Sequence, residues 1–413
     1  MSHALAAVRA HERPLTLALL LAVFAVNFMD RQIVAIVSEP IRLEFGLSDA
    51  QIGLLYRLAF AVVYSSAGIP IARWADRVNR AHIINGSLIV FSVMTLACGL
   101  AGSYAHLLAA RIGVAMGEGG TNPSSHSLIA DLYSEAQRGT AMAVFALGPN
   151  FGILLGFAFG GAIGQAWGWR SALLAAGAAG LVLAVLTSWL LKDTARVRSP
   201  APPSASLAEC VRALFRHPTM RHLFLGGAVM SIAAYAAIAW LPAFLIRSHG
   251  MGMADAGLTL AILLGGVGGV GTLLGGWLAD RLGARRRAWR LQVVAVALLG
   301  AAPFWPAALL VADARTALAC LVVPAAALCV YLAPTFAAVQ TLAEPRMRAL
   351  AAALLLLAGS LIGLGLGPLL VGALSDALRA SQGTDSLRLA MLVIVPLTLW
   401  SAVHYFLAGR ALQ

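Results

Sequence analysis

Five ionisable side chains lie inside otherwise apolar stretches of the first half of the sequence: Asp30, Arg31, Arg57, Arg111 and Glu118. A charge at the bilayer centre costs about 2.5–3.5 kcal/mol on insertion scales, so such residues persist where they face a partner or a water-filled space. A carboxyl group in that setting can carry a proton, and a guanidinium group can bind an anion in a bidentate manner. These residue types therefore indicate proton exchange and anion binding at a buried site.

Helical spacing places three polar side chains on one stripe of the first apolar segment. Asn27 precedes Asp30 by three residues and Arg31 by four, and residues at these separations share a helix face. We expect Asp30 to be a titrating or switching group that is paired with one of the arginines.

A second polar face is predicted further along the chain. Arg111 and Glu118 are seven residues apart, which is two helical turns, and Asn122 continues the same face. Pro123 follows directly, and a proline removes one hydrogen bond from the helical ladder. The sequence therefore predicts a locally weakened helix with a free carbonyl beside Glu118.

Glu118 is the predicted principal proton carrier. Burial favours the neutral acid, whereas a nearby arginine favours the carboxylate, so opening and closing a cavity around Glu118 would change which effect dominates. The alternative is a static network of buried ion pairs that holds two helices together, and the sequence leaves both interpretations open.

The charge of this site predicts the chemistry of its ligand. The five ionised groups carry a net charge of +1, which suits an anionic or zwitterionic head group. Arg31 and Arg57 are the leading candidates for binding it, although Arg57 could instead extend to the outer membrane interface. The predicted substrate-binding set is Arg31, Arg57, Arg111, Asn27, Asn122, Tyr235 and Tyr331.

The second half of the chain has no ionisable residue deep in an apolar segment. Its polar candidates are Tyr235, Trp240, Gln292, Tyr331, Thr335 and Ser360. Each of these residues taken alone is more often a packing residue. Together they predict a cavity that is charged on one wall and apolar or aromatic on the other, which suits an amphipathic substrate.

The composition identifies the elements that must position these residues. The chain has 413 residues, of which 60% are hydrophobic and 11% are charged, whereas soluble domains are about 25% charged. This excludes a disordered chain, an ordinary soluble enzyme and a nucleic-acid-binding domain. The sequence predicts an all-α membrane protein with twelve transmembrane helices, at 14–37, 52–73, 83–101, 107–130, 139–163, 171–191, 222–247, 256–278, 291–311, 316–341, 349–374 and 388–408.

The distribution of basic residues predicts the orientation of the chain. Of the 29 Lys and Arg residues, the predicted loops place 20 on one side of the membrane and 6 on the other. Basic residues accumulate on the cytoplasmic side. We therefore expect a multi-pass protein of the bacterial inner membrane with both termini in the cytoplasm.

The two halves of the chain resemble each other. The sequence A-D-R ends the second predicted span at Asp76 and Arg77 and recurs 204 residues later at Asp280 and Arg281. Residues 192–221, rich in proline and basic residues, lie between the halves. We predict an N-terminal six-helix bundle at 1–191, a cytoplasmic linker at 192–221 and a C-terminal six-helix bundle at 222–413.

A carboxylate at the C-terminus of a helix opposes the helix dipole and needs a partner. The repeated motif therefore predicts ion pairs that open and close the cytoplasmic side. The candidates for this gating are Asp76, Arg77, Arg80, Asp280, Arg281 and Arg285.

Glycines recur at steps of four in the fifth and eleventh predicted spans, at Gly148, Gly152, Gly156 and Gly160 and at Gly359, Gly363 and Gly367, and the eighth span is also rich in glycine. Such runs let helices approach closely. They predict either smooth contacts on which the bundles rock or ordinary tight membrane packing.

Several motifs resemble a known family. G-W-L-A-D-R-L-G-A-R-R resembles the signature of the major facilitator superfamily. Within it, N-F-M-D-R-Q, R-I-G-V-A-M-G-E-G, G-W-R and G-L-G-L-G-P-L-L-V-G-A-L-S-D resemble the spinster-like transporters. The resemblance implies two pseudo-symmetric six-helix bundles, a central cavity, alternating access and proton-coupled movement of lipids or lysolipids, with helices 2, 5, 8 and 11 between the bundles.

By the same resemblance, Asp30, Arg31 and Glu118 match the functional acid–base positions of the family. Tyr56 and Arg57 stand where the family usually has small or neutral residues, so the pocket of this chain is expected to differ.

The sequence thus predicts a proton-coupled secondary transporter of an amphipathic anionic or zwitterionic small molecule. The alternative within the same fold is a proton-coupled symporter of small organic or aromatic acids. A lipid-remodelling enzyme is less favoured, because no nucleophile–base pair, metal-ligand cluster or nucleotide loop is visible. The duplication and the glycine-rich runs argue against a static membrane scaffold. The expected partners are the substrate, protons and membrane lipids, with no cofactor, metal or nucleic acid, and the chain is expected to be a monomer.

Overall fold

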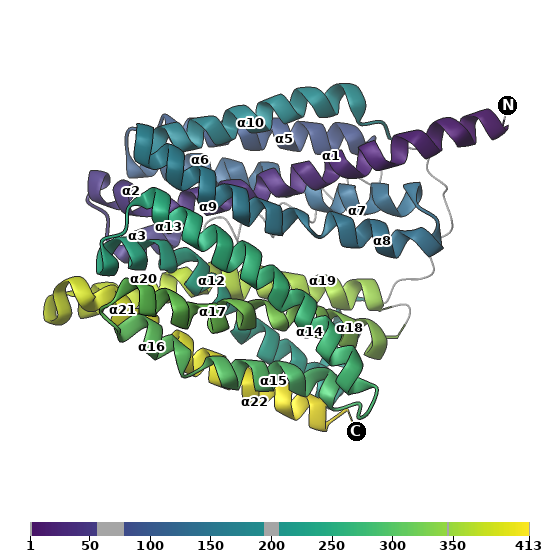
Figure 1. Cartoon of the computed structure of the whole chain (residues 1–413). Helices are drawn as coiled ribbons and strands as arrows, with labels where there is room; N and C mark the ends of the chain where they lie inside the picture. Colours follow the sequence, from purple (N-terminus) through teal and green to yellow (C-terminus); the bar gives the residue numbers. More distant parts are fainter. Residues whose placement is uncertain (1, 56–77, 194–205, 345–346, 413) are drawn as a thin grey trace. The chain divides into compact units, whose positions relative to one another are not determined.

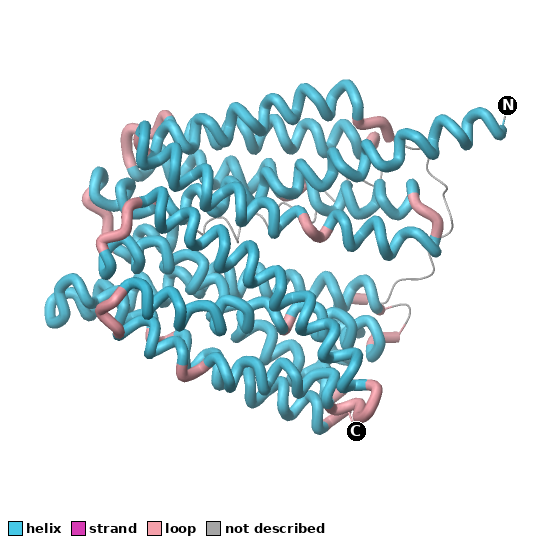
Figure 2. The backbone as a smooth tube through the Cα atoms, in the orientation of Figure 1, coloured by secondary structure: helices cyan, strands magenta, loops and turns pink. Residues whose placement is uncertain are grey.

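The computed structural model describes residues 2–55, 78–193, 206–344 and 347–412. These residues form helices joined by short loops, and no strand occurs among them (Figure 2). The all-α prediction is confirmed. Packing divides the chain into two units: residues 1–45, 59–199 and 253–258 form unit 1, and residues 46–58, 200–252 and 259–413 form unit 2.

The helices that begin in the first half of the sequence are labelled in Figure 1. They are α1 (Ser2–Ile36), α2 (Ser38–Phe45), α3 (Asp49–Gly53), α5 (Arg80–Gly99), α6 (Tyr104–Glu118), α7 (Thr121–Leu132), α8 (Glu135–Phe145), α9 (Gly148–Trp167) and α10 (Trp169–Leu190). In unit 1, α1 packs along α9, and α5 packs along α10 and α6.

The helices of the second half follow a linker helix. They are α11 (Leu207–Arg216), α12 (Pro218–His249), α13 (Met253–Leu260), η2 (Ala261–Val267), α14 (Gly268–Gly283), α15 (Trp289–Ala301), α16 (Phe304–Leu310), α17 (Ala314–Val330), α18 (Leu332–Leu342), α19 (Arg348–Ala358), η3 (Gly359–Leu364), α20 (Gly365–Gln382), η4 (Gly383–Asp385), α21 (Ser386–Met391) and α22 (Ile394–Arg410). In unit 2, α12 packs along α22 and η3, and α14 packs along α17.

Within these described residues, nine helical segments are long and apolar enough to cross a membrane. The last of them, 350–410, covers the two predicted spans 349–374 and 388–408. The predicted span 107–130 is present as α6 and α7, and most of the span predicted at 52–73 lies outside the described residues. The observed segments therefore agree with twelve transmembrane helices.

The glycine stripes pack helices tightly inside each unit. A Cβ atom on Gly152 of α9 would lie 2.5 Å from the carbonyl oxygen of Ala25 on α1. Gly363 approaches Ser231 of α12, and Gly275 approaches Val330 at the end of α17, in the same way. These three contacts are examples of tight helix packing within a unit, which is the second of the two interpretations of the glycine runs.

Two short segments pack with helices of the other sequence half. Gly257 of α13 meets Gly161 of α9 in unit 1, where an added Cβ on Gly161 would lie 3.2 Å from the Cα of Gly257. An added Cβ on Gly53 of α3 would lie 2.7 Å from the carbonyl oxygen of Pro368 on α20, in unit 2. Gly53 and Gly257 are 204 residues apart, the same offset as the repeated A-D-R motif. The repeat thus extends to α3 and α13, the two short segments that pack with the other sequence half. The bundle boundaries 1–191 and 222–413 rest on the sequence alone and stay a prediction.

Candidate functional site: buried ion pairs and a hydroxyl-lined pocket

The fourth predicted span is broken beside Glu118. Helix α6 ends at Glu118 and α7 begins at Thr121, with Gly119 and Gly120 between them and Pro123 in the first turn of α7. Thr121 Oγ1 donates a hydrogen bond to the Glu118 carbonyl oxygen (2.9 Å), which satisfies one of the carbonyls at the end of α6. The weak point that the sequence predicts at Asn122–Pro123 lies two to three residues earlier, at the glycine pair.

Asp30 forms the first of two buried ion pairs in unit 1. Arg111 Nη1 lies 2.5 Å from Asp30 Oδ2, and Thr95 Oγ1 on α5 donates a hydrogen bond to Asp30 Oδ1 (3.1 Å). The side chains of Asp30 and Arg111 are buried. Both carboxylate oxygens of Asp30 are therefore satisfied, and the pair links α1, α5 and α6.

Arg31 and Glu118 form the second pair. Both Nε and Nη2 of Arg31 donate to Glu118 Oε2, with the Nε bond at 3.0 Å. The Arg31 guanidinium carbon lies 4.7 Å from the ring centroid of Phe28. Glu118 is fully buried, but 9% of the Arg31 side chain is exposed. Arg31 is thus the more exposed member of this pair.

Three oxygens around the second pair have no hydrogen-bond partner among the described residues: Oε1 of Glu118, Oδ1 of Asn27 and Oδ1 of Asn122. Asn27 Nδ2 itself donates to Thr121 Oγ1 (2.7 Å). Buried polar atoms are nearly always paired, so such atoms indicate a water, an ion or a ligand that completes the site.

The structure therefore brings together Asn27, Asp30, Arg31, Arg111 and Glu118, which the sequence selected. Asp30 pairs with an arginine as expected, and the other pair joins a predicted substrate ligand to the predicted proton carrier. Arg57, Asp76 and Arg77 lie outside the described residues. Two positions were missed, Thr95 and Thr121, because a lone threonine in an apolar run carries little signal in sequence.

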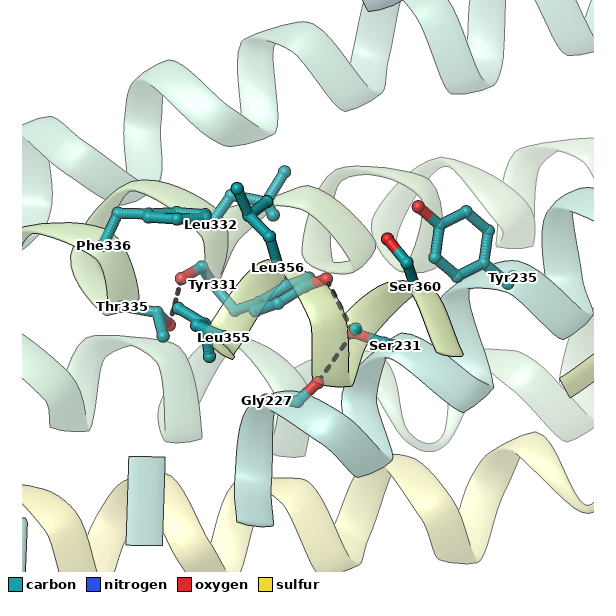
Figure 3. Close-up of a pocket in the computed structure, with 11 residues that line it drawn as sticks. Gly227, Ser231, Tyr235, Tyr331, Leu332, Thr335, Phe336, Leu355, Leu356 and Ser360 are labelled. Carbon is teal, nitrogen blue, oxygen red and sulfur yellow. Dashed lines mark hydrogen bonds between the residues drawn. The ribbon is translucent and has the colours of Figure 1, made fainter. Parts of the chain in front are cut away.

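A pocket in unit 2 collects the polar candidates of the second half (Figure 3). It has a volume of about 80 Å³ and is lined by residues of α12, the α17–α18 junction, α19 and η3. Tyr235, Tyr331, Thr335 and Ser360 lie on its wall together with Ser231. Two of its walls come from a helix break, at the α17–α18 junction, and from the wide helical turn η3, and such turns often occur at functional sites.

Hydrogen bonds fix part of the pocket wall. The hydroxyls of Tyr331 and Ser231 lie 3.4 Å apart, and Thr335 Oγ1 lies 2.6 Å from the Tyr405 hydroxyl. Leu355, Leu356 and Phe336 line the same space and supply its apolar surface. The pocket thus offers hydroxyl groups against an apolar background.

Two other polar candidates of the second half lie elsewhere. Trp240 is buried and donates from Nε1 to the carbonyl oxygen of Pro368 (2.8 Å). Gln292 packs against Gly409, whose added Cβ would lie 2.6 Å from Gln292 Cγ. Both contacts join helices within unit 2.

The described gating candidates have different environments. Arg80 is buried in unit 1, where it contacts Asp131 Oδ2 at 2.5 Å and Asp193 Oδ1 at 2.8 Å. Asp280 and Arg285 are exposed, and Arg281 lies over Trp277 with its guanidinium carbon 5.4 Å from the ring centroid.

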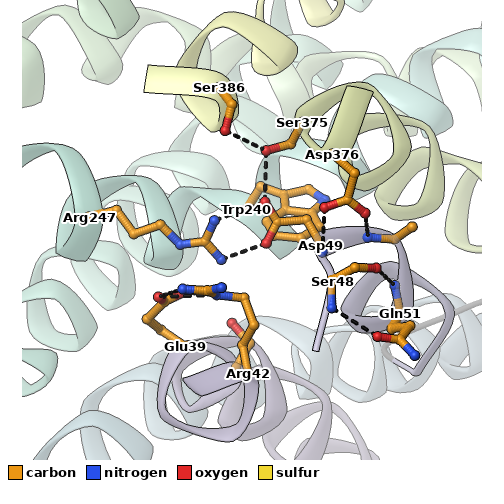
Figure 4. Close-up of polar contacts among 12 residues, drawn as sticks. Glu39, Arg42, Ser48, Asp49, Gln51, Trp240, Arg247, Ser375, Asp376 and Ser386 are labelled. Atoms are coloured by element: carbon orange, nitrogen blue, oxygen red, sulfur yellow. Dashed lines mark hydrogen bonds and ion pairs between the residues drawn. The ribbon is translucent and has the colours of Figure 1, made fainter. Parts of the chain in front are cut away.

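A polar network joins α3 to helices of the second half in unit 2 (Figure 4). Arg247 of α12 binds Asp49 in a bidentate manner, at 2.8 and 2.9 Å. Ser375 Oγ also donates to Asp49, and Asp376 accepts the backbone N–H groups of Asp49 and Ala50 at the start of α3. Asp49 is 1% exposed. No sequence pattern predicts this network, although Ser375 and Asp376 end the motif G-L-G-L-G-P-L-L-V-G-A-L-S-D.

Glu44 anchors the G-W-R motif within unit 1. Trp169 Nε1 donates to Glu44 Oε2 (2.7 Å), and Arg170 Nη2 lies 2.7 Å from Glu44 Oε1. The hydrogen bond from Arg170, followed by that from Trp169, lowers the pKa of Glu44 below its ordinary value. This cluster fixes the end of α2 to the start of α10.

A family model described as "Major Facilitator Superfamily" matches residues 20–354. The chain belongs to the major facilitator superfamily. It is 34% identical over 386 residues to an MFS-type efflux pump of Mycolicibacterium smegmatis. The aligned region covers 93% of this chain and 89% of the relative. It is 27% identical to a probable L-galactonate transporter of Escherichia coli, over 96% of this chain and 89% of that protein.

Solved structures place this superfamily member beside the spinster-like transporters. A bacterial homolog of the human lysosomal transporter Spinster, inward-facing and unoccupied, matches with a TM-score of 0.87 and 31% identity over 97% of each chain. The occupied inward-facing form matches with a TM-score of 0.85 and the same identity and coverage. The protein is therefore a spinster-like, multi-pass membrane transporter of the secondary type and not an enzyme.

Proposed function

We propose that the protein is a proton-coupled transporter of an amphipathic anionic or zwitterionic small molecule that works by alternating access. The observation that carries the proposal is the buried pair in which Arg31 is held by Glu118 through a single carboxylate oxygen. The second oxygen of Glu118 has no hydrogen-bond partner among the described residues. One arginine can therefore be exchanged between an internal carboxylate and a substrate anion.

Protonation of Glu118 neutralises the partner of Arg31. The guanidinium group then lacks its counter-ion, and a phosphate or carboxylate of the substrate can replace it in a bidentate manner. Because the two equilibria share Arg31, substrate binding would favour protonation of Glu118 and protonation would favour substrate binding. This reciprocity is the element of coupling that the geometry supports.

Asp30 has a different role in this proposal. Arg111 and Thr95 satisfy both of its oxygens, so Asp30 holds Arg111 and stabilises the packing of α1, α5 and α6. Asp30 can change partners only if Arg111 moves away, which makes it the second switching group in this proposal.

The hydroxyl-lined pocket of unit 2 supports an amphipathic substrate. Its apolar wall and its hydroxyls, among them those of Tyr235 and Tyr331, suit an alkyl or glyceryl portion. Within the charged cluster of unit 1, Arg31 suits an anionic head group.

The alternative is a proton-coupled symporter of small organic acids. Two relatives favour it: the probable L-galactonate transporter, and a probable galactarate/D-glucarate transporter of Bacillus subtilis that is 25% identical over 64% of each chain. A sugar acid would use the same Arg31 but would not need the apolar wall of unit 2.

Transport by the purified chain in liposomes separates the two candidates. We expect a pH gradient to drive movement of labelled lysophospholipid, with galactonate transported weakly or not at all. Preferential transport of galactonate would establish the alternative, and gradient-independent movement of both compounds would contradict proton coupling.

Glu118→Gln tests the coupling role in the same assay. It should abolish the dependence on the pH gradient while leaving exchange of substrate across the membrane. The matched control is Glu209→Gln on α11, because Glu209 belongs to a capping box at Ser206 that glutamine preserves. Gradient-driven uptake that survives Glu118→Gln unchanged would remove Glu118 from the mechanism.

The repeated A-D-R motifs are assigned to the cytoplasmic gate in this proposal. Asp280→Asn should slow turnover without changing substrate affinity, because the carboxylate at the end of α14 would lose its partners in one state only. An unchanged turnover rate would restrict the motif to setting the topology.

A further inference from the structure

A second cavity in unit 2 lies at the end of α14. It has a volume of about 280 Å³ and is bounded by the end of α14, one side of α18 along its length, the start of α15 and Leu412 near the end of the chain. Asp280, Arg290 and Thr341 are its polar lining residues, and Ala337 and Leu342 belong to its apolar wall. The cavity is separate from the hydroxyl-lined pocket, with which it shares no lining residue.

An unusually basic segment borders this cavity. Five arginines occur within ten residues, at Arg281, Arg285, Arg286, Arg287 and Arg290. All five are exposed, and none forms an ion pair within the described part of the chain. The segment therefore carries a positive charge. Among the described residues, Asp280 is the carboxylate that offsets part of it.

Arg290 is the arginine of this segment that lines the cavity. Its side-chain stem lies against Gly283, where an added Cβ would stand 2.3 Å from Arg290 Cγ, and the residue lines the cavity directly. The absence of a side chain at Gly283 lets the stem cross the end of α14 and brings the guanidinium to the same space as Thr341.

The same end of α14 carries interfacial aromatic and apolar surface. Trp277 is 55% exposed and Leu273 is 74% exposed, and Arg281 lies over the Trp277 ring. Tryptophans are enriched at the boundary between head groups and hydrocarbon. An occupant of the cavity therefore has phosphate-binding cations at one end and apolar helix surface beside it.

We propose that this cavity binds the phosphodiester head group of an anionic phospholipid, with Arg290 as its principal ligand. Basic pockets between transmembrane helices on the cytoplasmic side suit such head groups. The five arginines favour an anionic lipid over a zwitterionic one, because Asp280 cancels only one of their charges. Thr341 can donate a hydrogen bond to a phosphate oxygen, and the acyl chains lie along the exposed face of α14.

Native mass spectrometry of the full chain in detergent tests the site, with phosphatidylglycerol and phosphatidylcholine of identical acyl chains as probes. We expect the protein to retain one phosphatidylglycerol selectively. Arg290→Gln should weaken its binding about fivefold, which corresponds to about 1 kcal/mol per basic residue at an anionic lipid surface. Gly283→Ala should weaken binding in the same direction by displacing the Arg290 stem without removing a charge.

The matched control is Arg286→Gln, which removes an exposed arginine of the same loop that does not line the cavity. Equal losses for Arg286→Gln and Arg290→Gln would reduce the effect to diffuse attraction and overturn the proposal. Competition by soluble glycerol phosphate as strong as that by the lipid would assign the site to a free phosphate ester instead. These readouts measure binding only, so they do not depend on transport.

Discussion

Consecutive residues of one helix serve two different ion pairs. Asp30 contacts Arg111 of α6, whereas Arg31 contacts Glu118 at the end of the same helix. Neighbouring residues of an α-helix point in directions about 100° apart, so they reach partners two turns apart on α6. Four buried charges are thereby neutralised in pairs, and the pair that contains Glu118 retains an incompletely bonded carboxylate.

Removing one member of the second pair is expected to destabilise unit 1. Arg31→Gln leaves Glu118 buried without its counter-ion, at a cost of about 3–5 kcal/mol. The double variant Arg31→Gln, Glu118→Gln should recover most of that stability while still failing to couple transport to protons. Thermal unfolding in detergent, read beside liposome transport, measures both effects. A double variant with intact coupling would show that the pair is structural only.

The Glu44 cluster predicts a loss of stability in acid. The pKa of Glu44 is lowered in the folded protein by Arg170 and Trp169, so its stabilisation is present above the unfolded pKa of about 4.3 and is lost as pH falls through the folded value. The difference in melting temperature between the wild type and Glu44→Gln should therefore shrink as pH falls below about 4. A difference that stays constant across this range would contradict the assignment.

At the scale of elements, glycines have two structural roles: some allow two helices to pack closely, and others end a helix. The glycines of α9 bring it against α1, which carries Asp30 and Arg31. The glycine pair after Glu118 instead ends α6 and frees polar groups near the charged cluster. One set of glycines thus holds the charged helix in place, and the other gives the site its irregular backbone.

Gly152→Ala tests the packing role. The added Cβ would meet backbone and Cβ atoms of α1 at 2.5 Å, and overpacking of this kind costs about 1–3 kcal/mol. We expect a lower melting temperature and weaker transport. Gly86→Ala on α5 is the control, because nothing lies within 4 Å of its added Cβ. Equal melting temperatures for the two variants would show that α1 and α9 can separate without loss.

At the scale of the whole molecule, the repeated halves exchange short segments. Residues 46–58 pack in unit 2 and residues 253–258 in unit 1, and Asp49 is fixed to Arg247 and Ser375 by short polar contacts. The network of Figure 4 therefore holds α3 against helices of the second half within unit 2.

Asp49→Asn should lower the melting temperature in detergent, because it leaves Arg247 without its bidentate partner. Asp385→Asn removes the exposed pair with Arg388 and serves as control. Equal melting temperatures for the two variants would show that the network does not stabilise unit 2.

The orientation of the chain is a prediction of its own. With 20 of the 29 basic residues assigned to one side, both termini are expected in the cytoplasm. Fusions of green fluorescent protein to either terminus should fluoresce, and alkaline phosphatase fusions should be inactive. Active phosphatase at either terminus would contradict the even number of spans or the assigned orientation.

The sequence by itself determined the class of the protein and the identity of its buried charges. Apolar runs require helices in a bilayer, because every backbone polar group there must be satisfied within the segment. Charged residues in such runs are costly and need partners. Asp30, Arg31, Arg111 and Glu118 could be selected on these grounds, because the energetic penalty depends on local sequence alone, and helical spacing added Asn27.

Only the tertiary structure decided which partners these groups have. Helical periodicity places Asp30 and Arg31 on α1 but does not say which helix faces each of them. The same holds for Asp49, whose partner Arg247 lies 198 residues away, and for the glycine stripe of α9, which packs on α1. Pairing depends on how helices far apart in the sequence are brought together, and that is set by packing of the whole chain rather than by any local pattern.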